Sequence, residues 1–522
     1  MQTLSYSDSL LSILPPTIAL LVALITRRVI TALCCGILSG AYLLSDYSIN
    51  DSFVYLSQLA VGLVWDEGEA NFWNLQIILF LLLLGGMTSL MSAAGSTQAF
   101  AEWAKRRIKT QRHATIATAL LSFVVFVDDY FHSLAVGSVA RPLTDQAGVS
   151  RAKLAYLLDS TAAPVCVLMP LSSWGAYIIA LVGGLLVSHG ITNITPLAAF
   201  ATMIPLNFYA VFALLMALTV AYFNLNIGPM KQHEDAAAAG QLFDPAKGTP
   251  PGSINHDFQA SNGSPLGLVL PIIILTLVTF SCFVVTGAAT IESQVSFSLL
   301  LALENTDVTL SLVIGGAAAL LLSMGFAAKQ SLSLQQIINA LWLGIKAMSP
   351  AIAILLFAWS ISGVIGDIET GKYLASRLTG SIDPSMLPVL LFILAGVMAF
   401  ATGTSWGTFG IMLPIAADMA VASDVSLILP MLSAVLAGAV FGDHCSPISD
   451  TTILSSTGAA CHHLDHVATQ LPYALLVALI SIASYIVMGI TGNVMAALSI
   501  GLGLFAISTA GLYYLQQTPV KA

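Results

Sequence analysis

Long runs of apolar residues, separated by short polar stretches, dominate the chain. Many of these runs approach the ~20 apolar residues that a helix needs to cross a bilayer. They predict membrane helices over Leu10–Thr26, Val29–Ser45, Phe72–Ser92, Pro196–Phe223, Leu266–Ala288, Val308–Ala327, Ala340–Ile365, Leu387–Ala401, Ile411–Ala422, Leu427–Phe441, Leu475–Ile490 and Val494–Leu515. A shorter run, Phe53–Trp65, is expected to lie at the outer interface. The pattern predicts an all-α polytopic membrane protein.

Polar residues, glycine or proline interrupt the apolar pattern at four places. The interruptions fall at Asp128–Asp129, at Asp159, Pro164 and Pro170, at Thr402–Gly410 and at Gly442–Gly458. Breaks of this kind are typical of transporters, whose discontinuous helices line a central site. We expect re-entrant hairpins at the first and third places and broken transmembrane helices at the second and fourth.

The stretch Gly442–Gly458 (GDHCSPISDTTILSSTG) is unusually polar for its apolar surroundings. It holds Asp443, His444, Pro447 and Asp450, together with six Ser/Thr hydroxyls. An ionised Asp near a bilayer centre costs at least ~2.5–3.5 kcal/mol, so such residues usually face a cavity. Proline breaks the helix and frees carbonyl oxygens. Carboxylate, hydroxyl and carbonyl oxygens together suit a hard cation such as Na⁺. The alternative is a polar loop at the membrane surface.

The candidate ion- or substrate-binding residues are the polar side chains at these breaks: Asp128, Asp129, Tyr130, His132, Thr402, Thr404, Ser405, Asp443, Ser446, Asp450, Thr451, Thr452, Ser455 and Ser456. Adjacent carboxylates such as Asp128 and Asp129 cannot both ionise cheaply in a low-dielectric cavity, so one of them should hold a proton readily. That property suits an exchanger, in which a proton and a cation compete for one site. The alternative for this pair is a salt bridge to Arg141.

For the other candidates the sequence leaves two interpretations open. Asp450 and its neighbouring threonines form either an ion site or a structural polar break. Asp443 and His444 form either a proton relay or a polar helix end. Thr402–Ser405 either supplies hydroxyls and free backbone groups or allows close helix packing at its glycine.

Composition agrees with a membrane protein. Of the 522 residues, 57% are hydrophobic and 8% are charged, and the mean hydropathy is +0.90. A soluble chain would be about a quarter charged. The formal charge of −9 comes without a basic, aromatic-interleaved patch, so no nucleic-acid partner is predicted. The six cysteines lack a CxxC spacing and are expected to be core residues. Acidic Asp8 precedes the first run, which favours a retained helix over a signal peptide.

Two further classes of protein are disfavoured. The cluster at 462–466 (HHLDH) lacks a standard zinc-ligand spacing, so we expect a solvated interfacial turn and no structural metal. No GxSxG, HExxH or SxxK string occurs in a suitable context, so neither an enzyme nor a bound cofactor is predicted.

An internal repeat is suggested by two similar strings, APVCVLMPLSSWG and SPISDTTILSSTG. They pair Pro164 with Pro447 at an offset of 283 (447 − 164 = 283). The basic loop Lys105–Arg112 and its mixed-charge counterpart Asp367–Asp383 favour halves of inverted topology, since basic loops stay inside. The expected organisation is a helical pair with an interfacial segment (1–71), a first transport repeat (72–223), a flexible hydrophilic linker (224–265), scaffold helices (266–336) and a second transport repeat (337–522).

The strings at Gly442–Ala459 (GDHCSPISDTTILSSTGA) and Cys461–Leu475 (CHHLDHVATQLPYAL) strongly resemble the NhaC-type sodium/proton antiporter family. The string at Phe126–Ser138 (FVDDYFHSLAVGS) is similar to that family's acidic first-half signature. The resemblance extends from about Phe72 to Leu515. It implies secondary transport in a bacterial inner membrane and an inverted-repeat fold with re-entrant hairpins. It also implies a likeness to the ion-transporter superfamily, whose members are commonly dimers with elevator-like motion.

The predicted function is secondary active exchange of Na⁺ for H⁺ by alternating access, with the carboxylates binding either ion in turn. Na⁺, H⁺ and membrane lipid are the expected partners, and the resemblance adds a homodimer. The alternative is a cation-coupled carrier of a small organic acid, of the malate/lactate type, or of an amino acid, because some family members carry these. The two central breaks offer no basic side chain for an anionic group, which favours a bare cation.

The charge asymmetry predicts that Lys105–Arg112 lies inside and Asp367–Asp383 outside. Single cysteines at Thr110 and Ser381, in a background without reactive native thiols, should therefore react with an impermeant maleimide from opposite sides of the membrane. Labelling of both cysteines from one side would contradict the inverted repeat.

Overall fold

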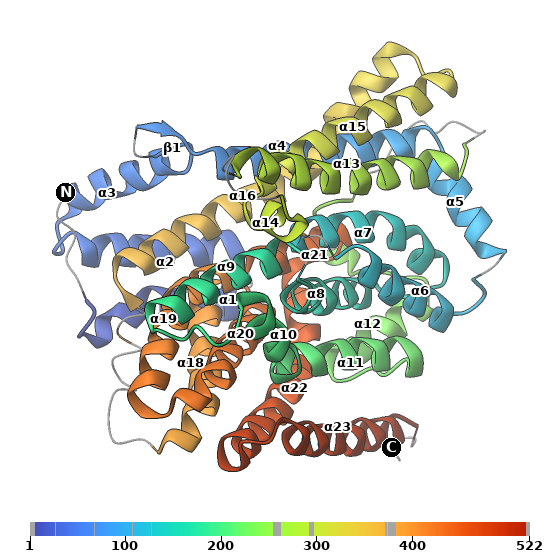
Figure 1. The fold of residues 1–522 in the computed structure, drawn as a ribbon. Coiled ribbons are helices and arrows are strands. Elements are labelled where there is room, and N and C mark those ends of the chain that lie inside the picture. Colours follow the sequence, from blue (N-terminus) through green and yellow to red (C-terminus); the bar gives the residue numbers. More distant parts are fainter. Residues whose placement is uncertain are drawn as a thin grey trace.

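The computed structural model describes residues 6–26, 28–66, 68–106, 108–126, 128–170, 172–253, 263–291, 297–370, 373 and 383–517. This part of the chain is almost entirely helical (Figure 1). Within it, nine helices are long and apolar enough to cross a membrane, or up to eleven if each of two bent pairs counts as one span. The prediction of an all-α polytopic membrane protein is thus confirmed. Much of the loop 367–383, including Ser381, lies outside the described residues.

The elements of the first half run from the amino terminus to residue 253: η1 Leu10–Ile13, α1 Leu14–Thr26, α2 Val29–Leu44, α3 Ile49–Gly62, the hairpin strands β1 Trp65–Asp66 and β2 Glu69–Ala70, α4 Phe72–Ala93, α5 Ser96–Lys105, α6 Gln111–Val124, α7 Asp129–Gln146, α8 Arg151–Leu168, α9 Ser173–Ser188, α10 Pro196–Met203, η2 Ile204–Leu206, α11 Phe208–Phe223, α12 Pro229–Ala238 and η3 Pro245–Lys247.

The elements of the second half follow from residue 266: α13 Leu266–Thr290, α14 Leu299–Glu304, α15 Val308–Lys329, α16 Leu334–Asp367, η4 Pro384–Met386, α18 Leu387–Thr402, α19 Ser405–Ser423, η5 Val425–Leu427, α20 Ile428–Cys445, α21 Asp450–Gly458, α22 His463–Thr491 and α23 Val494–Gln517.

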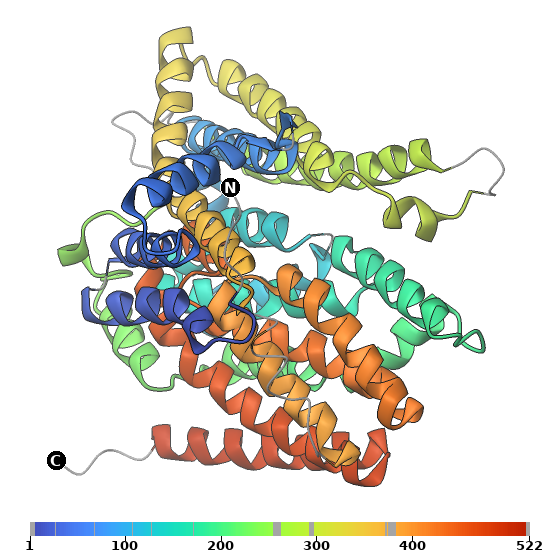
Figure 2. The same cartoon turned by 90° about the vertical axis from the view of Figure 1, so that its left-hand side faces the viewer.

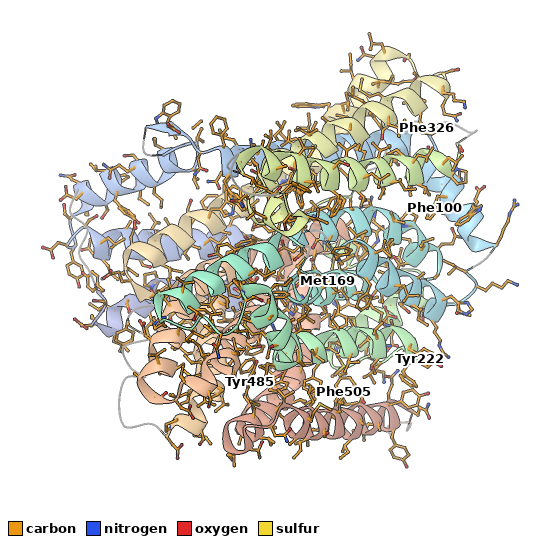
Figure 3. All side chains as sticks on the ribbon, viewed as in Figure 1. Phe100, Met169, Tyr222, Phe326, Tyr485 and Phe505 are labelled. Carbon is orange, nitrogen blue, oxygen red and sulfur yellow. The ribbon has the colours of Figure 1, made fainter. Side chains whose placement is uncertain are left out.

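The helices are arranged around a central group made of α7, α8 and α21. Helices α4, α13 and α15 lie on one side of this group. On the other side α11 and α22 pack against α8, and α23 lies outside them, as Figure 1 shows. On the second side, Phe505 of α23 stacks on Phe212 of α11, with 6.2 Å between the ring centroids (Figure 3). Short α21 therefore lies deep inside the molecule, which is an unusual position for a polar segment.

The four predicted breaks are present, and they recur at a constant spacing. The chain leaves the helical conformation between α6 and α7, between α8 and α9, between α18 and α19, and between α20 and α21. The starts of α8 and α20 differ by 277 (428 − 151 = 277), and so do the starts of α9 and α21 (450 − 173 = 277). The order of these elements thus repeats, although α21 with 9 residues is shorter than α9 with 16. The inverted orientation of the two copies stays a prediction.

This spacing corrects the register of the repeat. Pro170 lies in the break after α8, and Pro447 occupies the same place after α20 (447 − 170 = 277). Pro164, which the sequence strings paired with Pro447, instead lies inside α8. Asp159 also lies inside this continuous helix, so only Pro170 marks a real break there.

Two glycines explain how the breaks pack. Gly403, between α18 and α19, has a φ of +69°, and a Cβ there would lie 2.6 Å from the carbonyl oxygen of Ile448. Gly137 of α7 faces Gly458 of α21, and a Cβ on Gly137 would lie 2.8 Å from the Gly458 carbonyl oxygen. Small residues of this kind allow two membrane helices to approach closely. The contact of Gly137 with Gly458 brings the second-half break against a first-half helix, and Gly403 brings the two second-half breaks together.

Two expected elements differ from the structure. The single span Pro196–Phe223 is bent by 54° between Leu206 and Phe208, where Asn207 accepts a hydrogen bond from the Ala210 N–H and so caps a new helix. The short third run forms α3, which turns back from α2 by 120°. Whether α3 lies at the interface stays a prediction.

The expectation of a flexible, solvated linker is wrong for residues 224–253. This stretch forms α12 and η3, and Glu234 of α12 is buried, where it pairs with Lys153 of α8 at 2.6 Å between Oε2 and Nζ. Oε1 of Glu234 also accepts from the Ser150 backbone N–H at 2.8 Å. The charges of this stretch therefore fasten it to the helical bundle. The domain boundaries themselves stay a prediction.

The buried Lys153–Glu234 pair leads to a prediction about stability. Removing one partner leaves the other charge buried and unpaired, which costs about 3–5 kcal/mol. We expect Glu234→Gln to lower the unfolding temperature in detergent and to expose residues 224–253 to protease. Asp235→Asn, an exposed neighbour on the same helix, should do neither. Equal behaviour of the two variants would show that the pair does not fasten the segment.

Candidate functional site

The first-half and second-half breaks meet at a cluster of carboxylates, which we call the carboxylate cluster: Asp128, Asp129, Tyr130, Trp174 and Asp450. The Tyr130 hydroxyl donates to Oδ2 of Asp450. The Trp174 indole donates to Oδ1 of Asp129 at 2.9 Å. Asp128 and Asp450 are both close enough to act on Asp129 electrostatically. Two adjacent acids of the first half and Asp450 of the second half thus share one buried region.

Each carboxylate of this cluster lies at the amino end of a helix. Asp128 caps α7 by accepting from the Phe131 N–H at 3.0 Å, and Asp129 lies in the first turn of the same helix. Asp450 lies in the first turn of α21 and accepts from the Thr451 N–H at 2.8 Å. The amino end of a helix carries a partial positive charge, which stabilises a nearby anion. Both halves therefore aim a positive helix end at the same buried acids.

A second buried centre, the Asp159 network, lies beside the first. Asp159 of α8 accepts four side-chain hydrogen bonds, from Thr452 at 3.1 Å, Ser455 at 3.2 Å, His466 Nε2 at 3.1 Å and Gln470 Nε2 at 2.6 Å. Two of these donors come from α21 and two from α22. The carboxylate oxygens of Asp159 are well satisfied, so this acid holds three helices together.

Asp443 and His444 connect the two centres. The Ser405 hydroxyl donates to Oδ2 of Asp443 at 2.8 Å, which joins α19 to α20. Nδ1 of His444 lies 3.2 Å from the Tyr209 hydroxyl, and the His444 carbonyl accepts from Gln470 at 2.8 Å. Both residues are buried, so they do not form an exposed helix end.

The other predicted residues are bonded mainly to the protein backbone or to near neighbours. Ser446 donates to the Phe400 carbonyl, Ser456 to the Ile453 carbonyl, and Thr402 to the Met398 carbonyl of its own helix. The His132 ring bridges the Val125 carbonyl and the Thr161 hydroxyl, and Thr451 bonds to Ser449. Thr404 lines a cavity described below. These hydrogen bonds hold the broken helices in place, and the role of these side chains in ion binding stays a prediction.

Several alternatives from the sequence are now excluded. Every residue from Gly442 to Gly458 is buried, so this stretch is not a surface loop. The Arg141 guanidinium donates to the Gly252 carbonyl at 2.8 Å. The expected solvated turn at 462–466 is wrong for His463 and His466, because α22 begins there and turns both rings into the bundle. Among the described residues, no three His, Cys, Asp or Glu side chains gather to hold a metal ion.

Sequence reasoning missed Asp159, Trp174, His466 and Gln470 as site residues. The sequence contains a signal for His466 and Gln470, because residues four apart lie on the same face of a helix. Asp159 is an acid in an apolar run, but no pattern in the sequence indicates which residues bond to it. No sequence pattern distinguishes Trp174 from the other aromatic residues of the apolar runs.

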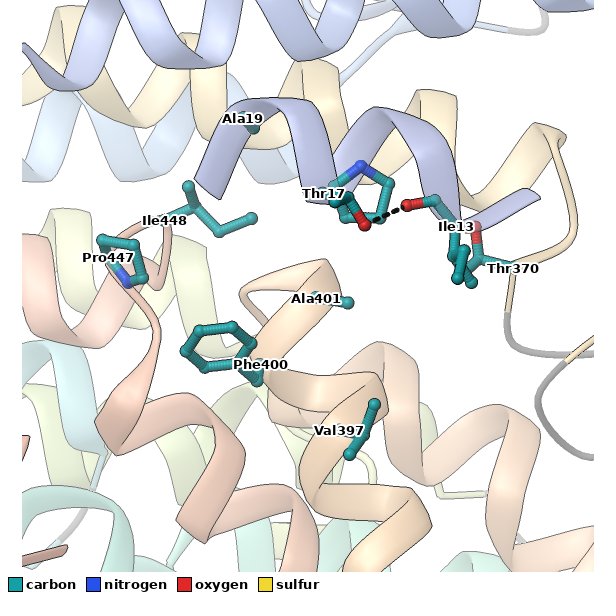
Figure 4. A pocket seen from close by; sticks show the side chains of 10 residues that line it. Ile13, Thr17, Ala19, Thr370, Val397, Phe400, Ala401, Pro447 and Ile448 are labelled. Carbon is teal, nitrogen blue, oxygen red and sulfur yellow. Dashed lines mark hydrogen bonds between the residues drawn. The ribbon is translucent and has the colours of Figure 1, made fainter. Parts of the chain in front are cut away.

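Two cavities adjoin the breaks. One, of about 320 Å³, reaches Asp450 and Tyr130 and is lined also by Trp73, Trp359 and Trp406. The other, of about 180 Å³, lies between α1 and the α18 end, against Pro447 and Ile448 (Figure 4). Among the described residues that line the second cavity none is acidic or basic, whereas the first presents the Asp450 carboxylate to a ligand.

The comparison with known families now decides the classification. The profile of the Na⁺/H⁺ antiporter family matches residues 165–490, which is more than half of the chain. The chain belongs to the Na⁺/H⁺ antiporter family. This protein is therefore a multi-pass membrane transporter of an antiporter family. The match includes Asp443 and Asp450, whereas Asp128, Asp129 and Asp159 lie before its start.

Three relatives show how far the similarity extends. An uncharacterized protein of Haemophilus influenzae is 50% identical over 514 residues, 97% of this chain and 97% of that protein. A malate-2H(+)/Na(+)-lactate antiporter of Bacillus subtilis is 32% identical over 155 residues, 29% of this chain and 32% of that protein. An uncharacterized Na(+)/H(+) antiporter of Haemophilus influenzae is 34% identical over 139 residues, 27% of this chain and 28% of that protein.

The different surroundings of Asp159 and Asp450 lead to a second stability prediction. Asp159→Asn removes one acceptor oxygen from a group that faces four donors, and an unpaired buried donor costs about 1–3 kcal/mol. We expect this variant to lower the unfolding temperature measurably. Asp450→Asn leaves one acceptor oxygen for only two donors, the Tyr130 hydroxyl and the Thr451 N–H, and should lower the unfolding temperature less. The reverse order of unfolding temperatures would contradict the structural role assigned to Asp159.

Proposed function

We propose that this protein exchanges Na⁺ for H⁺ across a bacterial inner membrane by alternating access. The observation that carries the proposal is the meeting of Asp129 and Asp450, one acid from each half, at the adjacent amino ends of α7 and α21. Oδ2 of Asp129 is buried and accepts no hydrogen bond from the described residues. A buried carboxylate oxygen requires a partner, and a proton or a hard cation is a suitable one.

Competition between the two ions follows from the proximity of the acids. Carboxylates that act on one another in a low-dielectric region do not all ionise freely, so a proton binds readily when no cation is present. A bound Na⁺ neutralises the same charges and displaces that proton. Each ion therefore excludes the other, which is the requirement for exchange at a single site.

The Asp159 network supports this proposal by surrounding the site with fixed dipoles. Beyond the carboxylate cluster, four more buried polar atoms have no hydrogen-bond partner among the described residues. They are Asp443 Oδ1, His444 Nε2, His466 Nδ1 and Gln470 Oε1. Groups of this kind exchange protons or bind water in buried networks. A path for protons along them is part of the proposal.

An organic-acid carrier is the second candidate, because one relative is a malate-2H(+)/Na(+)-lactate antiporter. A carboxylate-bearing substrate usually needs Arg, Lys or a helix amino end as its partner. No Lys, Arg or His lines the cavity that reaches Asp450, as far as the described residues define it. The lining therefore favours a cation over an anion.

Flux in proteoliposomes tests the proposal directly. Purified protein in acid-loaded liposomes should release H⁺ when external Na⁺ is added, with no organic solute present. The apparent Na⁺ affinity should weaken as the pH falls, because protons occupy the same carboxylates. Asp450→Asn should abolish the flux, and Asp128→Asn and Asp129→Asn should each shift the pH profile or stop turnover.

Asp51→Asn provides the matched control, because Asp51 is an exposed acid of α3 far along the chain from the breaks. It should leave both flux and pH profile unchanged. Proton movement that starts only after malate, lactate or an amino acid is added would favour the second candidate. Normal profiles in all three site variants would remove the carboxylate cluster from the mechanism.

A further inference from the structure

The cavity beside Asp450 is much larger than a bare ion requires. Its volume is about 320 Å³, whereas one water molecule occupies about 30 Å³ in the liquid. Pockets for small organic ligands begin at about 300 Å³. The space next to the carboxylate is therefore of the size that suits a compact organic molecule.

Four of the nine residues that line this cavity are aromatic. Trp73, Trp359, Trp406 and Tyr130 come from four different helices and all line it. The Trp406 ring is fixed by its neighbours, with Trp174 at 5.5 Å and Tyr177 at 4.8 Å between ring centroids. Faces of Trp and Tyr rings attract cations, and groups of such rings recognise alkylammonium ions. A hydrated Na⁺ gains less from such a wall than an organic cation does.

The charged residues of the lining determine whether the cavity favours a cationic or an anionic ligand. Asp450 is the acidic residue of the lining, and Asn74 and Thr404 add neutral polar groups. Among the described residues that line the cavity, none is basic, so an anionic ligand would meet only repulsion from Asp450. An organic cation would place its charge by Asp450 and its alkyl groups against the rings.

We propose that this cavity binds a small organic cation of the alkylammonium class, which is exchanged for protons at the same carboxylate as Na⁺. The inference rests on the proposed function, because both ligands use Asp450. It adds the aromatic wall as a determinant of specificity. The organic cation and Na⁺ then compete, and a proton on Asp450 displaces either one.

Tetramethylammonium is the probe of choice, because it has no proton to lose and cannot cross the bilayer as a free base. Binding to purified protein is measured by tryptophan fluorescence in a potassium buffer free of Na⁺ and amines. We expect saturable binding that Na⁺ competes away and that Asp450→Asn abolishes. Trp359→Leu should weaken the apparent affinity by about tenfold, which corresponds to ~1.4 kcal/mol, and Trp359→Phe should restore most of it.

Trp342→Leu is the matched control, because Trp342 lies on α16 like Trp359 but is exposed at 63%. It should bind tetramethylammonium as the wild type does. In liposomes, external tetramethylammonium should also drive H⁺ release, and Trp359→Leu should lower the ratio of this flux to the Na⁺-driven flux.

The outcomes separate the two proposals. Na⁺-driven H⁺ release without saturable tetramethylammonium binding would overturn this inference and leave Na⁺/H⁺ exchange intact. Tetramethylammonium binding that Asp450→Asn does not change would overturn it as well, because the cation would then lie elsewhere. Saturable, Asp450-dependent binding without Na⁺-driven flux would support the organic-cation site and overturn Na⁺/H⁺ exchange.

Discussion

The structure depends on the burial of several carboxylates inside an apolar helical bundle. A buried charge is costly unless hydrogen bonds or opposite charge compensate it. Asp159 receives four side-chain donors, and Asp450 receives a tyrosine hydroxyl and a backbone N–H. Asp129 receives an indole N–H. Continuous helices offer no free backbone donors, so the broken helices provide what the acids near them require.

The sequence could predict those parts of the site that have a local signal. Pro447, Gly403 and the adjacent acids at 128–129 each disturb the chain at their own position, and the structure breaks there. Asp159 gives no such signal, because its helix continues past it. Its importance arises from His466 and Gln470, which are more than 300 residues away in the sequence. Partners of that kind cannot be found from spacing along one chain.

The composition of residues 224–253 led to a wrong prediction for a related reason, since the partner of the buried acid lies far away in the sequence. A stretch rich in small and polar residues resembles a solvated linker, yet Glu234 finds Lys153 at a distance of 81 residues along the chain. The predicted alignment of the two halves was wrong because it matched a Ser-Ser and glycine string that both halves contain, and not the positions of the helix breaks. Proline and capping residues determine where the helices end. Matching these helix boundaries aligns the two halves at an offset of 277 residues (447 − 170 = 277).

Helix α21 joins the two buried centres physically. Asp450 at its first residue bonds to Tyr130 of α7, while Thr452 and Ser455, on the same nine-residue helix, bond to Asp159 of α8. Gly458 at its other end packs against Gly137, where a side chain would not fit. A displacement of α21 as one body would therefore alter both the bond between Asp450 and Tyr130 and the bonds to Asp159, so the geometry of the two centres is linked through this helix.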